Sequence, residues 1–95
     1  MVSLTAVIRC KAGSKATIRE ALLKVAAHAS ENEPGTISYF VSETSTDVFI
    51  THERYRDQQA LDTHNEGAGA KRFFAEAESA LDKVEVYIGP EILPG

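Results

Sequence analysis

The chain has 95 residues, which is enough for one domain over residues 1–95 and too few for two domains of ordinary size. Its composition is typical of a globular protein, with 43% hydrophobic and 25% charged residues. The net charge is −4 and the lysines and arginines are scattered, which excludes the basic stripe of a nucleic-acid-binding protein. One cysteine excludes an intramolecular disulfide, and no apolar run approaches the roughly 20 residues of a membrane span. The N-terminal residues alternate in polarity and do not resemble a signal peptide, so we expect a soluble, cytoplasmic protein.

The first part of the chain predicts a strand followed by a helix. Residues 2–10 alternate between polar and apolar side chains, as in a half-buried strand. Residues 15–32 repeat apolar side chains at helical spacing, and Ser14 is the expected N-cap. The apolar stripe of this helix consists of Ile18, Leu22, Val25 and Ala29. Pro34 and Gly35 end the helix because the residue before a proline avoids helical geometry.

A predicted hairpin follows, with strands over 36–43 and 48–56 and a turn over 44–47. Successive residues of a strand point to opposite faces, so Tyr39 and Phe40 make both faces of the sheet apolar. The same alternation places Ile37, Tyr39 and Val41 on one face. A sheet that is apolar on both faces must be covered on both. A second copy of the same chain would cover it most simply, which predicts a homodimer.

The last part of the chain predicts a helix in two pieces and a final strand. Asp57 is the expected N-cap of a short helix that runs to about Asn65, and residues 66–69 interrupt it. The next helix carries Phe73, Ala77, Ala80 and Leu81 along one side. Residues 83–89 alternate again and predict the last strand. The order βαββαβ predicts a ferredoxin-like α+β fold, a four-stranded antiparallel sheet with the helices on one face.

Several short motifs lie in a fixed order between residues 33 and 65. They are Glu33-Pro34-Gly35, Tyr39, Glu53-Arg54-Tyr55 and, nine residues after Tyr55, His64. Together with the terminal Gly89-Pro90-Glu91, these motifs resemble the antibiotic biosynthesis monooxygenase family over nearly the whole chain. The resemblance implies a dimeric α+β barrel whose pocket lies between the sheet and the helices. In many members that pocket oxidises phenols or quinols without metal, flavin or heme.

The chain departs from the family pattern at one place. Many members carry a second histidine five residues after the first, followed by a phenylalanine, whereas Gly69 and Ala70 stand at these positions. A mechanism that needs both histidines is therefore not expected. The sequence also contains no tryptophan, which the heme-degrading branch of the family uses, so heme degradation is excluded.

The predicted hairpin carries most of the candidate substrate-binding residues. Phe49, Thr51, Glu53 and Tyr55 alternate on one face of its second strand, and Tyr39 can line the same pocket. One apolar wall with a few polar anchors is the usual composition of a small-ligand pocket. The alternative is that these aromatic residues only pack in the core. For Glu53, which lies near a strand end, the alternative is a solvated carboxylate that pairs with a neighbouring lysine or arginine.

His64 is the candidate catalytic residue. It lies three residues after Leu61 on the short helix and so faces inward with it. An imidazole exchanges protons near neutral pH and could accept the proton of a phenolic substrate. The alternative is a partly buried histidine whose hydrogen bond is only structural.

Three functions stay open at this point. The first is a cofactor-independent monooxygenase that oxidises a small phenolic or quinol-type aromatic with dioxygen. The second is an isomerase of a small carbonyl compound, phosphorylated or not, with Lys71 and Arg72 as anion contacts. The third is a non-catalytic dimeric binding or stress-response module. A metal is not expected, because the three histidines and Cys10 lack the spacing of metal ligands, and Cys10 is expected to be a small core residue.

Overall fold

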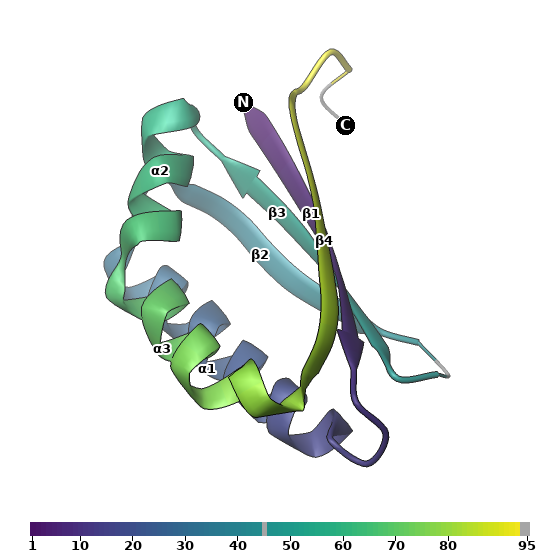
Figure 1. Ribbon diagram of the computed structural model, residues 1–95. Coiled ribbons are helices and arrows are strands. Elements are labelled where there is room, and N and C mark those ends of the chain that lie inside the picture. Colours follow the sequence, from purple (N-terminus) through teal and green to yellow (C-terminus); the bar gives the residue numbers. More distant parts are fainter. Residues whose placement is uncertain (45, 94–95) are drawn as a thin grey trace.

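The computed structural model describes residues 1–44 and 46–93. Its elements are β1 (Val2–Cys10), α1 (Lys15–Asn32), β2 (Thr36–Glu43), β3 (Val48–Tyr55), α2 (Gln58–Glu66), α3 (Ala68–Ala77), the short 3-10 helix η1 (Glu78–Ala80) and β4 (Leu81–Pro90). The strands form one antiparallel sheet in the order β2-β3-β1-β4. The helices all cover the same face of this sheet and leave the other face open (Figure 1). The α+β ferredoxin-like fold predicted from the element order is confirmed.

The core forms between β1 and α1, as their apolar periodicities predicted. The inward side chains of β1 and the apolar stripe of α1 are buried, and all of them except Ala29 belong to one core cluster: Leu4, Ala6, Ile8, Cys10, Ile18, Leu22, Val25 and Ala29. Ser14 occupies the predicted N-cap position of α1, but its side chain makes no capping hydrogen bond. Its backbone carbonyl instead accepts the N–H of Ile18, so the expected side-chain cap is wrong.

The hairpin differs from the prediction at its edges. Ile37 is exposed, whereas Tyr39 and Val41 pack against the core, because the β2–β3 register shifts between Thr36 and Ser38. Ile37 therefore does not share the burial that strict alternation predicted. In the predicted turn over 44–47, Ser45 lies outside the described residues.

The two-piece helix begins as predicted, because the Asp57 carboxylate accepts the N–H of Ala60 at 2.8 Å. Only Gly67 separates α2 from α3, so the interruption is shorter than the expected residues 66–69. Leu81 was expected on the helix but begins β4, where it pairs with Cys10 across an irregularity in the β1–β4 register. That pairing lengthens β4 beyond the predicted strand.

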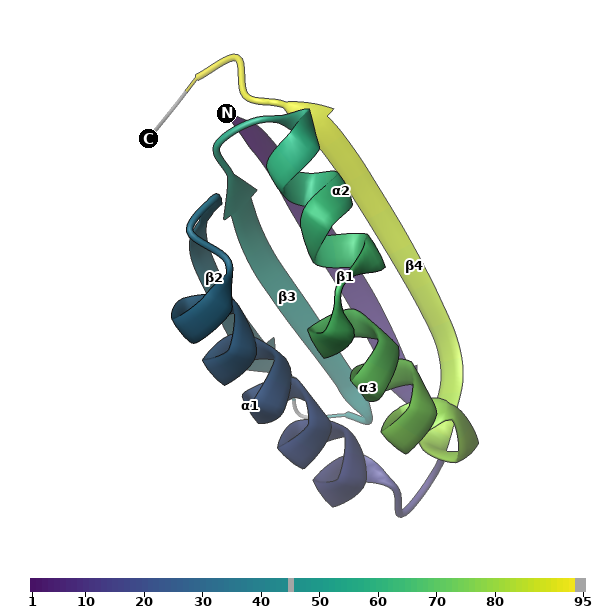
Figure 2. The same cartoon turned by 90° about the vertical axis from the view of Figure 1, so that its left-hand side faces the viewer.

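The helices leave two parts of the sheet uncovered. On the inner face Val84 packs against the core, but Val86 and Ile88 are exposed because α2 and α3 do not reach over the β4 edge (Figure 2). On the outer face Phe40 and Tyr87 are 58% and 61% exposed. Among the described residues, no helix combines the length and apolar character that a membrane crossing needs.

Candidate functional site

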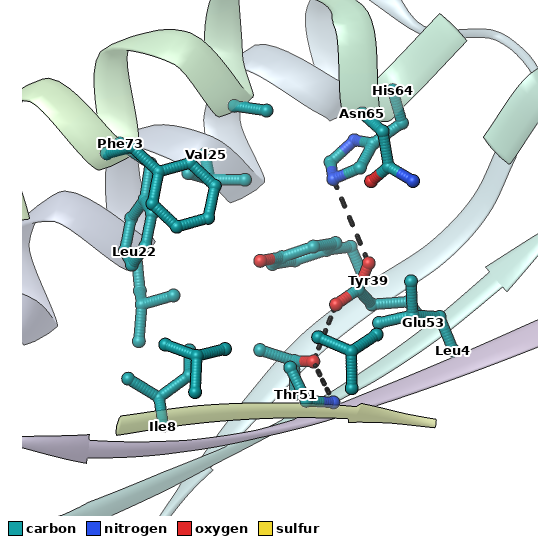
Figure 3. Close-up of a pocket in the computed structure, with 15 residues that line it drawn as sticks. Leu4, Ile8, Leu22, Val25, Tyr39, Thr51, Glu53, His64, Asn65 and Phe73 are labelled. Carbon is teal, nitrogen blue, oxygen red and sulfur yellow. Dashed lines mark hydrogen bonds and ion pairs between the residues drawn. The ribbon is translucent and has the colours of Figure 1, made fainter. Parts of the chain in front are cut away.

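A cavity of about 190 Å³ lies between the sheet and the helices (Figure 3). Most of its wall is apolar and comes from β1, α1, α3 and β4: Leu4, Ala6, Ile8, Leu22, Val25, Ala70, Phe73, Phe74, Val84 and Val86. Its polar groups come from β2, β3 and α2: Tyr39, Thr51, Glu53, His64 and Asn65. The cavity therefore has an apolar body and a polar end, which is the usual anatomy of a small-ligand site.

Glu53 is central to the polar end. Its side chain accepts a hydrogen bond from the Thr51 hydroxyl at 2.5 Å and another from the Tyr55 hydroxyl. Thr51 Oγ1 in turn accepts the backbone N–H of Ala6 at 2.9 Å. Glu53 is only 5% exposed, and its partners are hydroxyl groups and a histidine. The alternative of a solvated carboxylate paired with a lysine or arginine does not hold, because β3 is an inner strand of the sheet and Glu53 lies on the face that the helices cover (Figure 2).

Burial decides the protonation behaviour of this cluster. It raises the pKa of the Glu53 carboxyl, and the hydrogen bonds from Thr51 and Tyr55 act in the opposite direction. Burial and the neighbouring Glu53 charge also raise the pKa of both Tyr39 and Tyr55. Both tyrosines therefore remain phenols that donate hydrogen bonds. Glu53 is a carboxyl group for which gaining a proton costs less than it does in water.

His64 faces inward from α2, as its position on the helix predicted, and is 6% exposed. Its Nδ1 lies 2.6 Å from Glu33 Oε1, and its Nε2 lies 3.8 Å from Glu53 Oε1. The imidazole thus lies between two carboxylates that come from different parts of the chain. The Tyr39 ring lies 5.7 Å from the imidazole, and its hydroxyl points into the cavity (Figure 3).

Glu33 is the residue of this cluster that the sequence analysis missed as a functional group. It is 8% exposed, and its Oε1 accepts the Thr36 hydroxyl at 3.1 Å as well as the His64 contact. Gly35 brings this loop close to α2, because a Cβ at Gly35 would lie 2.5 Å from the Cβ of Ala60. The Glu33-Pro34-Gly35 motif is the feature of the sequence that could have indicated this role, since it ends α1 and also places the Glu33 carboxylate within hydrogen-bond distance of His64.

The structure brings four of the six predicted site residues together around the cavity: Tyr39, Thr51, Glu53 and His64. Tyr55 is fully buried behind Glu53 and contacts it without lining the cavity. Phe49 is buried in the core and lines a separate hollow beside Phe40 and Val41. Lys71 and Arg72 are exposed and do not line the cavity.

The other candidate groups for chemistry lie outside the cavity. Cys10 is buried in the core, and burial raises the pKa of its thiol, which agrees with its predicted role as a small core residue. In residues 1–44 and 46–93, no group of three or more histidine, cysteine or acidic side chains is arranged to hold a metal ion.

Comparisons with known proteins agree with this architecture. The family model described as antibiotic biosynthesis monooxygenase matches residues 1–76. Similar solved structures include a protein from Nitrosomonas europaea (14% identity, 98% of this chain and 100% of that chain, TM-score 0.89) and one from Caulobacter crescentus (20% identity, 97% and 90%, TM-score 0.89). A third, from Mycobacterium tuberculosis, is 22% identical over 98% of this chain and 96% of its own, with a TM-score of 0.88. No curated protein matched the sequence. The chain therefore belongs to the antibiotic biosynthesis monooxygenase family, within the dimeric α+β barrel superfamily.

Proposed function

We propose that this protein is a cofactor-independent monooxygenase that oxidises a small phenolic or quinol-type aromatic with dioxygen. One observation carries the proposal: His64 Nε2 and the Glu53 carboxyl group lie at the polar end of a cavity that is otherwise mainly apolar. Such a site can remove a proton from a hydroxyl group and keep the resulting anion away from water.

His64 is the proposed base. Because a carboxylate accepts hydrogen bonds, we assign the proton of the neutral imidazole to Nδ1, beside Glu33 Oε1, and the lone pair to Nε2 on the side of the cavity. A substrate hydroxyl placed beside Nε2 can therefore transfer its proton to the imidazole. The Tyr39 phenol can donate a hydrogen bond to the same substrate, since its hydroxyl points into the cavity (Figure 3). The nearby Glu53 carboxyl favours the imidazolium that forms, in the manner of a carboxylate beside a catalytic histidine.

The remaining chemistry belongs to the substrate and to dioxygen. The phenolate gives one electron to dioxygen, and the resulting aryloxyl radical and superoxide combine at a ring carbon into a peroxide anion. The proton held by His64 returns to this peroxide, and the ring C–H proton is lost as the O–O bond breaks. One oxygen atom stays on the ring as a quinone carbonyl and the other leaves as water. The phenol loses four electrons and dioxygen gains four.

The cavity size sets the scale of the substrate. A cavity of about 150 Å³ in another protein holds benzene, so about 190 Å³ here suits one aromatic ring with small substituents. The opening near Phe74 and Val86 gives room for a further apolar group, since both side chains line the cavity and are exposed. A compact phenol with its hydroxyl at His64 and its apolar part near α3 fits this arrangement.

Oxygen consumption tests the proposal. Purified protein is given a panel of phenols and hydroquinones in an oxygen electrode without added cofactor, and the products are analysed after reaction under ¹⁸O₂. We expect oxygen uptake above the uncatalysed rate and one labelled oxygen atom in the product. The enzyme proposal would be wrong if panel members bind in the cavity without accelerated oxygen uptake, and the binding-module alternative would then be favoured.

The isomerase alternative has less support. Its expected anion contacts, Lys71 and Arg72, are exposed and lie outside the cavity lining. The cavity is lined by mainly apolar side chains and by the Glu53 carboxyl group, and Glu33 contacts His64 from outside the lining, an arrangement that does not favour a phosphorylated substrate.

We also propose that the protein works as a homodimer through the open face of its sheet. Phe40 and Tyr87 are exposed there, and Phe40 stacks on His52 at 4.7 Å between ring centroids. A second sheet packed on this face would bury these rings, as the family resemblance implies. Light scattering should give twice the 10.3 kDa mass of the chain, and Phe40→Asp should lower it toward the monomer. A stable wild-type monomer at micromolar concentration would contradict this arrangement.

A further inference from the structure

Gly69, the position at which the sequence lacks the expected second histidine, lies against another histidine. His28 of α1 packs on the first turn of α3 so closely that a Cβ at Gly69 would lie 2.7 Å from His28 Cδ2 and 3.1 Å from His28 Cγ. Any larger residue at this position would force the His28 ring to move. The glycine therefore makes room for an imidazole that comes from α1.

The His28 ring is directed at the carboxylate that contacts His64. Its Nε2 lies 3.6 Å from Glu33 Oε2, whereas His64 contacts the other oxygen, Oε1. The Asn32 amide lies 3.3 Å from His28 Nδ1 and can donate to it. That contact leaves the proton of a neutral His28 on Nε2, where it points toward Glu33.

Glu33 is 8% exposed, so its second oxygen has little access to water, and His28 is the group that lies within ion-pair distance of it. Its Oε1 has two partners, His64 and the Thr36 hydroxyl, while Oε2 has the His28 contact. A buried carboxylate with one oxygen poorly satisfied would favour other side-chain orientations. With both oxygens engaged, Glu33 keeps the orientation in which Oε1 receives the Nδ1 proton of His64.

We propose that His28 and Glu33 are positioning residues that hold His64 in the tautomer with its proton on Nδ1 and its Nε2 free to act as a base. The inference rests on the proposed function only in giving His64 that role. His28 contacts Glu33 from outside the cavity lining, so it acts through Glu33 and does not contact the substrate. The second imidazole of this site is thus supplied by α1, at the place where Gly69 permits it.

Two substitutions of His28 distinguish this role from simple packing. His28→Gln keeps a side-chain N–H that can reach Glu33, whereas His28→Phe keeps the ring volume and removes the polar contact. Gly69→Ala is an independent variant. It keeps the His28 side chain but displaces its ring, because the added Cβ would lie too close to that ring. This variant keeps the proposal testable if His28→Phe does not fold.

The first measurement needs no substrate. Nitrogen-15 NMR of histidine-labelled protein reports the tautomer of His64 and the exchange of its Nδ1 proton with water. We expect the Nδ1–H form in the wild type and in His28→Gln. A mixed tautomer population and faster proton exchange are expected in His28→Phe, Gly69→Ala and Glu33→Leu. Wild-type tautomer and exchange in both His28→Phe and Gly69→Ala would overturn the proposal, as would a change in His28→Gln as large as that in His28→Phe.

The second measurement is turnover with an aromatic substrate that the oxygen assay identifies. His28→Phe and Gly69→Ala should lower kcat by about tenfold to 10²-fold with KM little changed, and His28→Gln should retain most of kcat. A tautomer change without any detectable turnover would support the positioning role and count against the monooxygenase. Normal turnover together with the wild-type tautomer in His28→Phe would count against the positioning role alone.

Discussion

Two neighbouring residues of β3, Glu53 and Arg54, show that charged side chains have different partners and different pKa shifts on the two faces of the sheet. Arg54, on the open face, donates two hydrogen bonds to Glu91, from Nε at 2.9 Å and from Nη2 at 2.7 Å. The Ser3 hydroxyl also donates to Glu91, and these contacts lower the pKa of the Glu91 carboxyl to about 2. On the helix-covered face, burial raises the pKa of Glu53, whose partners are hydroxyl groups and His64.

The difference separates a structural carboxylate from a chemically useful one. An arginine is always charged, so the Arg54–Glu91 pair stays ionised on both sides over the physiological pH range and has no proton to exchange. The inner cluster contains carboxyl groups, phenols and imidazoles, and within residues 1–44 and 46–93 no arginine or lysine pairs with its carboxyl groups. Its groups can therefore gain and lose protons, which is what acid–base catalysis requires.

Removing the proposed base should have the largest effect. In His64→Ala we expect turnover to fall by about 10² to 10⁴, because the proposed general base is removed from the cavity. The wild-type rate should also fall on the acid side as the His64–Glu53 pair gains a proton, and the variant should lack that limb. Steady-state oxygen uptake across pH measures both effects. Thr63→Ala, at an exposed neighbour on α2, is the control and should keep nearly normal turnover; an equally small loss in His64→Ala would mean that His64 is structural.

Glu53→Gln should change how stability depends on pH. The folded-state pKa of Glu53 is raised, so its stabilising contribution is fully present below the unfolded value of about 4.3 and is lost as pH rises through the folded value. The wild type should therefore lose stability relative to Glu53→Gln as pH increases from about 4.3. Urea unfolding from acid to neutral pH measures this trend. A stability difference that stays constant over that range would show that burial does not raise the pKa of the Glu53 carboxyl group.

Glu91→Gln should show the opposite sign on the other face. The folded-state pKa of Glu91 is lowered to about 2, so its stabilising contribution is present above the unfolded value of about 4.3. The wild type should be the more stable protein at neutral pH, and its advantage should disappear as pH falls toward 2. The same urea series tests this, and added salt should reduce the difference because the arginine is partly exposed. Turnover should be little affected if the pair is only structural.

The smallest effect is expected for Tyr55→Phe. The variant loses one hydrogen bond to Glu53 and should be destabilised by about 0.5–1.5 kcal/mol in unfolding experiments. Turnover should fall by less than about tenfold, because Tyr55 supports Glu53 from behind and does not line the cavity. Tyr87→Phe is the matched control on the open face, where the hydroxyl donates to Glu85 at 3.0 Å, and both variants are compared in the Phe40→Asp background so that the proposed dimer contact does not contribute. We expect its stability to stay within about 0.5 kcal/mol of the protein that keeps Tyr87. Equal losses of stability in Tyr55→Phe and Tyr87→Phe would contradict the expected difference between the covered and the open face.

Periodicity along the chain was sufficient to determine the elements and the faces they present. Alternation placed Glu53 on the same face of β3 as Phe49 and Thr51, and helical spacing placed His64 inward on α2. These features depend on neighbours a few residues away, so the sequence reports them directly. The exceptions, the exposed Ile37 and the early start of β4 at Leu81, arise where strand register shifts, which depends on the partner strand.

The contents of the site depended on contacts between distant parts of the chain. Glu33 and His64 are 31 residues apart and meet because Gly35 lets the loop after α1 lie against Ala60. His28 reaches Glu33 because Gly69 leaves room for its ring at the α1–α3 contact. Phe49 and Tyr55 alternate with the site residues on β3, but the positions of α1 and α2 above the sheet decide that neither lines the cavity. The sequence by itself therefore determined the fold and the inward-facing groups, while helix–sheet packing decided which of them share one cavity, because that packing is set by side chains far apart in the sequence.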